Sequence, residues 1–195
     1  MEVADYWPEV RDDLSKVIWS HATNSHQVRG ANVVTCDYKH CVQALQEAIA
    51  GDTMMIEADV SIGPGGEPIM AHPPAIDSDL SLQQFLDIVI AETEAGARKG
   101  IKLDFKAIEI VEPSLKMVKL VESKLNFPVW LNADIIVGPG GGPPVDAEKF
   151  LSLCTQYIPG ECQYSKHYSP DNIITRCHSE PGVHHRSGSA GSLHH

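Results

Sequence analysis

Polar side chains recur two residues apart in three otherwise apolar segments of this sequence. The pairs are Glu57 and Asp59, Asp104 and Lys106, and Asn132 and Asp134. Residues two apart in an extended strand point to the same side of the chain. Gathered carboxylates repel each other unless a cation lies between them, and hard oxygen ligands suit Mg²⁺ or Ca²⁺. We therefore expect Glu57, Asp59 and Asp104 to hold Mg²⁺ or Ca²⁺, with Asn132 and Asp134 lining the same pocket.

Two histidines have settings that favour a catalytic role. His21 closes an apolar segment, and His72 lies between Ala71 and two prolines in a rigid loop. Histidine changes charge near neutral pH and is the commonest general acid or base. The alternatives are structural: His21 could be a hydrogen-bonded core residue, and a single carboxylate near a strand end is often a helix cap or an ion-pair partner.

The elements that position these residues alternate between strands and helices. Apolar or β-branched segments predict strands, and an apolar stripe at helical spacing, with a capping residue or an early proline, predicts helices. Strands are expected over 16–21, 54–60, 100–106 and 127–136, with helices over 41–50, 82–90, 113–125 and 146–154. This order indicates a parallel sheet, in which ligands bind at the carboxyl ends of the strands. Residues 62–72 predict a hairpin beyond the second strand.

Length and charge limit the classes of protein that fit. The 195 residues fall short of the about 250 of a complete eight-stranded α/β barrel. A net charge of −11 argues against a nucleic-acid partner. We expect no transmembrane segment, because no apolar run approaches about 20 residues. The first residues contain no signal-peptide pattern, which suggests a cytoplasmic protein.

The last 36 residues differ from the rest of the chain. In residues 160–195 the acidic and basic residues balance, so all of the net charge lies in residues 1–159. The segment is rich in His, Gly and Ser and has no sustained apolar periodicity, so we expect a poorly ordered tail after a domain of residues 1–159. Residues 138–144, rich in Gly and Pro, are expected to be a plain connector.

The odd number of cysteines leaves two hypotheses open. Five cysteines without a C-x-x-C pair predict reduced thiols in a reducing compartment. A small loop disulfide between Cys36 and Cys41 is the alternative if the protein is exported.

Six segments in order resemble the signature blocks of the menorin family, over roughly residues 16–159. They are Trp19-Ser-His-Ala22, Met55-Ile-Glu-Ala-Asp-Val60, Pro68-Ile-Met-Ala-His-Pro-Pro74, Gly100-Ile-Lys-Leu-Asp-Phe-Lys106, Val111-Glu-Pro-Ser114 and Pro128-Val-Trp-Leu-Asn-Ala-Asp-Ile135. The menorin domain is distantly similar to glycerophosphodiester phosphodiesterases and sphingomyelinase D enzymes. The resemblance implies a TIM-barrel-like, phospholipase-C-like phosphodiesterase fold, of which about four βα units out of eight are present here.

The resemblance also implies roles for the polar residues. His21, His72 and Lys106 correspond to catalytic positions, and Glu57, Asp59 and Asp104 to the metal site. A metal-dependent phosphodiester hydrolase or lyase acting on a phosphodiester or lipid-derived small molecule is therefore one hypothesis. The other is an adhesion or signalling module with a relic site, because family members, some secreted or membrane-anchored, act in neuronal development and photoreceptor maintenance and have protein partners at the cell surface.

The sequence departs from the family after Pro159. Family members continue into a further strand with a Ser-x-Gly-Trp-Thr-type motif, which Gly160-Glu-Cys-Gln-Tyr-Ser165 does not match. We therefore expect an incomplete or variant form with weak or no catalysis. The outer edges of its parallel strands are expected to be unpaired.

Overall fold

A computed structural model describes residues 1–21, 26–27, 36–37, 41–136, 143–158, 163–165 and 172–177. The elements, in chain order, are α1 (Val3–Tyr6), the 3₁₀ helices η1 (Pro8–Val10) and η2 (Leu14–Lys16), β1 (Trp19–Ser20), β2 (His26–Gln27), β3 (Cys36–Asp37), α2 (Cys41–Ala50), β4 (Met55–Ile62), β5 (Pro68–Met70), α3 (Leu82–Glu94), β6 (Gly100–Phe105), α4 (Ile108–Val121), the 3₁₀ helix η4 (Glu122–Lys124), β7 (Val129–Asp134), α5 (Ala147–Tyr157), β8 (Gln163–Ser165) and β9 (Asn172–Cys177).

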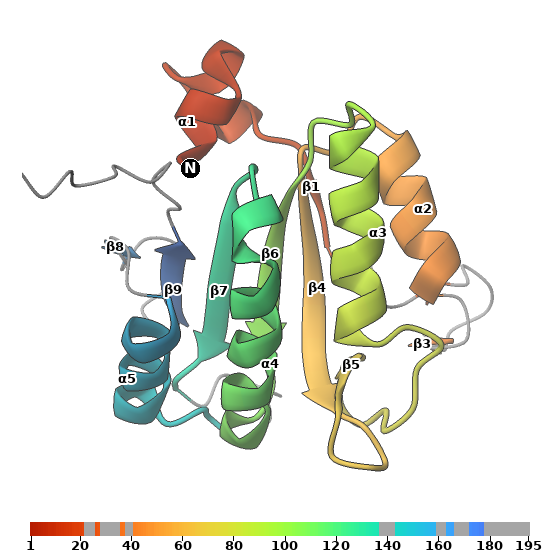
Figure 1. The fold of residues 1–195 in the computed structure, drawn as a ribbon, viewed down its shortest axis with the longest axis vertical. Helices are drawn as coiled ribbons and strands as arrows, with labels where there is room; N and C mark the ends of the chain where they lie inside the picture. The colour runs from red at the N-terminus through yellow and green to blue at the C-terminus, as the bar shows by residue number, and fades with distance from the viewer. Residues whose placement is uncertain are drawn as a thin grey trace, which may run out of the picture.

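The strands form a mainly parallel sheet with helical crossovers, as the sequence predicts (Figure 1). Strands β1, β4, β6 and β7 are neighbours in that order and run parallel. Helices α2, α3 and α4 connect them successively. Strand β5 folds back antiparallel onto the end of β4, which confirms the predicted hairpin. The fold is therefore α/β, with four successive βα units.

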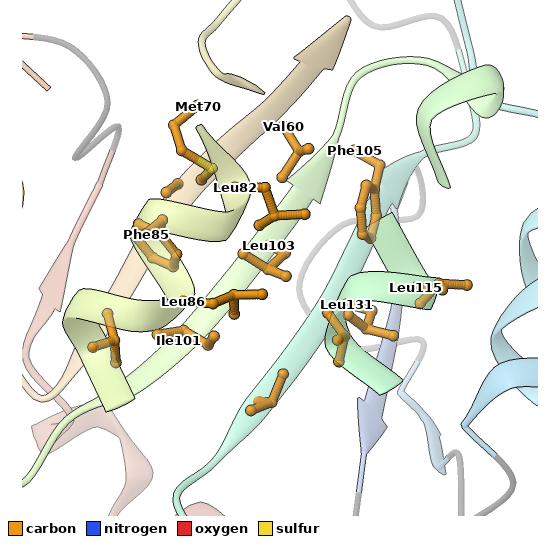
Figure 2. Close-up of a cluster of buried hydrophobic side chains, with 14 of the residues drawn as sticks. Val60, Met70, Leu82, Phe85, Leu86, Ile101, Leu103, Phe105, Leu115 and Leu131 are labelled. Atoms are coloured by element: carbon orange, nitrogen blue, oxygen red, sulfur yellow. The ribbon is translucent and has the colours of Figure 1, made fainter. Parts of the chain in front are cut away.

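The main hydrophobic core lies between the helices and one face of the sheet (Figure 2). Alternate strand residues such as Val60, Leu103 and Leu131 point toward the helices, where Phe85 of α3 and Leu115 of α4 pack against them. Burying each large apolar side chain contributes about 1.5–3 kcal/mol. Because strand side chains alternate between the two faces, the residues between these positions must face the opposite side of the sheet.

A smaller apolar cluster closes the sheet near the start of its strands. The N-terminal segment contributes Val3, Trp7, Val10 and Val17, which pack with Met55 of β4. Gly100 of β6 lies beside Met55, whose sulfur would be only 2.4 Å from a Cβ at that position. Glycine at residue 100 thus leaves the space that Met55 fills.

Several predicted boundaries differ from the structure, and among the starts those of the first strand and of helix α4 differ most. The first strand was expected over 16–21, but only Trp19 and Ser20 pair with β4, and residues 14–16 form a 3₁₀ turn that Asp13 caps. Helix α4 begins at Ile108 rather than at Pro113, which lies inside it. Proline lacks one backbone N–H, so Glu109 loses one helical hydrogen bond while Ile110 and Val111 gain burial in the core.

The helix starts at residues 41, 82 and 147 agree with the sequence. Ser81 begins α3 with a capping box, in which its hydroxyl accepts from the backbone of Gln84 and the Gln84 side chain accepts from the Ser81 backbone. Asp146 caps α5 by accepting from the backbone N–H of Lys149. Both residues satisfy helix N–H groups that otherwise have no partner.

Strand β9 corrects the expectation of an unpaired edge at β7. Residues 172–177 pair antiparallel with residues 129–134, and β8 pairs with β9 in turn. An antiparallel partner satisfies the same backbone groups that a further parallel strand would bind. The other residues of 160–195, and residues 138–142 of the connector predicted over 138–144, lie outside the described residues, so the domain boundary at 159 stays a prediction.

No helix within the described ranges is long and apolar enough to cross a membrane. In the same part of the chain, Cys41 and Cys154 are buried thiols and not disulfide partners. The Cys36–Cys41 disulfide is therefore not formed. The side chains of the other three cysteines lie outside the described part.

Candidate functional site

The polar residues predicted from spacing lie together on the sheet face opposite the helices. Strand register places Glu57 beside Lys102, Asp59 beside Asp104, and Asp104 beside Asn132. Their neighbours along the strands, such as Ala58, Leu103 and Leu131, belong to the helix-side core. The polar residues therefore share one face, toward the carboxyl ends of β4, β6 and β7.

Lys106 links two carboxylates at the centre of this group. Its Nζ lies 2.8 Å from Asp59 Oδ1 and 3.0 Å from Asp104 Oδ2. Asn132 Nδ2 donates to the other Asp104 oxygen at 2.8 Å. Asp59, Asp104 and Asn132 are 5%, 6% and 1% exposed, so this network is nearly withdrawn from water.

Burial and charge act against each other in this network. Burial lowers the pKa of Lys106, but Asp104 and Asp59 more than offset that effect and raise its pKa above the ordinary lysine value. Burial raises the pKa of Asp59, while the charge and hydrogen bond of Lys106 lower it and Asp104 raises it further. Lys106 therefore stays protonated at neutral pH and supplies the positive charge that the two acids need.

A second group of interacting side chains consists of His21, Glu57 and Lys102. Lys102 Nζ lies 2.7 Å from Glu57 Oε1, and both side chains are 13% exposed. The other Glu57 oxygen is hydrogen-bonded to His21 Nδ1. Sequence reasoning missed Lys102, although its position two residues before Asp104 is the same signal that identified Lys106.

His72 follows β5, which pairs with β4 beyond β1 on the edge away from β6. The backbone N–H of the preceding residue, Ala71, donates to the carbonyl oxygen of Asp59 at 3.1 Å. His72 is exposed, and its Nδ1 donates to the carbonyl oxygen of Pro73 at 2.6 Å. Thus His21 is hydrogen-bonded to Glu57, and His72 directly follows Ala71, which is hydrogen-bonded to Asp59.

The remaining predicted residue, Asp134, closes β7. Loss of hydration raises the pKa of its carboxyl, and the charge of Asp104 adds to this. Asp134 is therefore close enough to Asp104 to feel its charge, and its role as a pocket residue stays a prediction.

Two tryptophans lie beside the charged residues: Trp130 is the register partner of Lys102, and Trp19 stacks against His21. The rings of Trp19 and Trp130 have centroids 5.3 Å apart, and Trp19 also stacks against His21 at 6.1 Å. Both indoles pack on the cluster around Met55. The site thus combines two packed indole rings with the charged side chains.

The described side chains meet the chemical requirement for a hard cation but are not arranged around one. Within the described ranges, no three His, Cys, Asp or Glu side chains form a group that could hold a metal ion. Lysine ammonium groups neutralise the carboxylates instead. At this site, Asn132 Oδ1 is buried and has no hydrogen-bond partner among the described residues. Buried acceptors normally have one, so the site offers an unused oxygen beside Asp104.

These features define an α/β domain with a charged network at the ends of parallel strands. The family model of the Menorin N-terminal domain matches residues 13–162, so the chain belongs to the menorin family. Protein FAM151B of Homo sapiens is 39% identical over 153 residues, which is 76% of this chain and 48% of the human protein. The chain thus spans about half the length of that relative.

A solved structure gives a fainter likeness. The crystal structure of S. officinalis PLC21 is 15% identical and covers 55% of this chain and 14% of its own, with a TM-score of 0.39. That similarity is too slight to carry an argument about function.

Proposed function

We propose that this menorin domain binds a phosphodiester at the network of Asp59, Asp104 and Lys106 and has the residues for its cleavage. The observation that carries the proposal is a buried lysine shared by two carboxylates, next to an unused amide oxygen, with two histidines that follow β1 and β5 on the adjoining edge of β4. Lysine and a carboxylate-bound cation are groups that neutralise charge on a phosphoryl group. A lipid-derived phosphodiester is the substrate class proposed.

Each residue has a role in this proposal. His21, whose Nδ1 is bonded to Glu57, takes the proton of the attacking hydroxyl or water as its oxygen bonds to phosphorus. His72 gives a proton to the oxygen that leaves as its bond to phosphorus breaks. Each such group typically contributes about 10²- to 10⁴-fold in rate. Lys106 binds the charged oxygens of the phosphoryl group.

Mg²⁺ or Ca²⁺ would be held by the carboxylates of Glu57, Asp59 and Asp104 and would supply Lewis-acid charge to a non-bridging oxygen. The contacts of Glu57 with His21 and Lys102 leave it able to accept a further ligand, because a carboxylate has about four lone-pair sites. Lys106 contacts both aspartates, so a cation between them would have to displace its ammonium group.

Calorimetric titration of the 195-residue chain with Mg²⁺ and with Ca²⁺ tests the cation part of this proposal. Binding is expected in the native chain and should be lost in Glu57→Gln and in Asp104→Asn. Glu112→Gln, on the exposed side of α4, is the matched control and should bind as the native chain does. Unchanged binding in both site variants would refute the cation site.

Cleavage is tested separately with bis(p-nitrophenyl) phosphate and with a lysophospholipid. We expect slow product release by the native chain, because catalysis by an incomplete or variant form should be weak, and loss of release in His21→Ala and in His72→Ala, each of which should keep the native circular dichroism spectrum. Equal release by the native chain and the double variant would contradict the assigned histidine roles.

A second candidate is an adhesion or signalling module, of the kind expected in neuronal development or photoreceptor maintenance. The observation in its favour is that Lys102 and Lys106 already neutralise the carboxylates, so the network needs no bound cation to balance its charge. In a null-mutant rescue assay, a folded His21→Ala, His72→Ala double variant should restore the phenotype if this candidate is correct. Loss of rescue by the folded variant would count against it.

A further inference from the structure

We propose that Lys102 is a positioning residue, which acts through Glu57 to hold His21 with its proton on Nδ1 and its lone pair on Nε2. This inference rests on the proposed function, in which His21 is the base. It adds a residue to the site and explains how one particular ring nitrogen becomes available to the substrate.

The hydrogen bonds define the tautomer of His21. Glu57 Oε2 contacts Nδ1 of the ring, and an ionised carboxylate can only accept hydrogen bonds. Nδ1 must therefore carry the proton. In a neutral ring the lone pair then belongs to Nε2, which becomes the basic nitrogen.

Lys102 holds the carboxylate that makes this bond. The Lys102 and Glu57 side chains are each 13% exposed and lie 2.7 Å apart, whereas the His21 side chain is 72% exposed. The strand register makes the two charged residues direct neighbours on β4 and β6, so their backbones are fixed relative to each other. The exposed ring alone could not fix Glu57, but a mostly buried ion pair can.

Trp19 restrains the ring from another direction. Its indole stacks against the imidazole with an interplanar angle of 22°. Stacking limits the tilt of the His21 ring but does not distinguish its two nitrogens. The choice between them therefore depends on Glu57 and, through it, on Lys102.

His72 supplies an internal control for this argument. Its Nδ1 also donates to an acceptor, but that acceptor is the backbone carbonyl of the next residue, Pro73. No lysine is needed to hold a backbone carbonyl in place. A change at Lys102 should therefore affect the tautomer of His21 and leave that of His72 unchanged.

The test is nitrogen NMR of the ¹⁵N-histidine-labelled 195-residue chain, without metal or substrate. At a fixed pH about two units above the ordinary histidine value of about 6.5, the neutral tautomers can be distinguished. Among the signals of the ten histidines, those of the two rings at residues 21 and 72 are assigned with His21→Gln and His72→Gln. Both rings are expected to be protonated predominantly on Nδ1, although a histidine free in water prefers the proton on Nε2.

Substitutions then separate positioning from simple charge balance. Lys102→Met should shift His21 to predominantly Nε2–H, while His72 keeps its tautomer. Lys102→Arg, which restores a cationic donor, should return His21 toward the native state. Lys116→Met, which removes an exposed partner of Glu112, should change neither ring.

Two results would overturn the proposal. One is a native His21 protonated on Nε2, which can be measured even if every Lys102 variant fails to fold. The other is an unchanged His21 tautomer in folded Lys102→Met or Lys102→Gln. The NMR experiment contains no cation or phosphodiester, so its result does not depend on whether the chain binds a cation or cleaves a substrate. An Nε2–H tautomer of His21 would likewise leave the cation-binding and cleavage results unchanged.

Discussion

Replacing Lys106 by methionine should destabilise the fold far more than a surface lysine change does. Methionine has a similar length but no charge, so Asp59 and Asp104 would be left close together and 5% and 6% exposed, without their shared cation. Removing one partner of a buried ion pair costs about 3–5 kcal/mol in free energy of unfolding. The exposed Lys116–Glu112 pair, with side chains 58% and 45% exposed, is worth about 0–1 kcal/mol.

Urea unfolding at pH 7 measures this difference, with tryptophan fluorescence as the signal. For a urea dependence of about 2 kcal/mol per molar, the Lys106→Met midpoint should fall by roughly 1.5–2.5 M. The Lys116→Met midpoint should fall by less than about 0.5 M. Adding Asp59→Asn to Lys106→Met should recover part of the lost stability, because the free-energy effects of substitutions at contacting residues are not additive.

The same experiment tests the cation proposal independently. Mg²⁺ should stabilise Lys106→Met more than the native chain, since a bound ion would replace the missing ammonium charge. Equal midpoints for Lys106→Met and Lys116→Met would show that the network contributes no more than a surface pair. That result would refute the claim that burial makes the loss of Lys106 more costly than the loss of an exposed lysine.

Three further changes have expected outcomes. Phe85→Ala should cost about 3–5 kcal/mol in urea unfolding, because Phe85 is 1% exposed, whereas Leu120→Ala, at a residue 83% exposed, should change stability by less than about 0.5 kcal/mol. Ser81→Ala should cost about 1 kcal/mol through loss of the α3 cap, and normal stability would contradict the cap. Burial raises the pKa of the Cys41 thiol to about 11, so iodoacetamide should leave it unmodified at pH 8 and react in urea, as peptide mass spectrometry would show. Because the folded thiol holds its proton to higher pH than the unfolded one, Cys41 should also make stability fall above about pH 9.

Local chemistry predicted the parts of this fold that depend on neighbouring residues. Ser81 and Asp146 cap helices because a side-chain oxygen reaches an N–H within three residues, a relation visible in sequence. The two-residue spacing of Glu57 and Asp59 correctly put both on one face, since strand geometry fixes it.

Features that depend on distant residues were harder to predict. The pairing of Lys102 with Glu57 follows from the register of β4 against β6, which no local pattern specifies. Pro113 was expected to start a helix, but burial of Ile110 and Val111 favours an earlier start. The antiparallel pairing of β9 with β7 was missed because residues 172–177 were expected to lie in a poorly ordered tail.

The arrangement of the outer strands affects how molecules of this protein meet each other. The main sheet ends in β1 on one side and in β8 on the other, which are two and three residues long. Strand β5 covers the end of β4 beyond β1. A strand from a second molecule would therefore find only short rows of backbone groups to bind, which is a common protection against edge-to-edge aggregation. In concentrated solution, association through the sheet edges of the described region should therefore be weak.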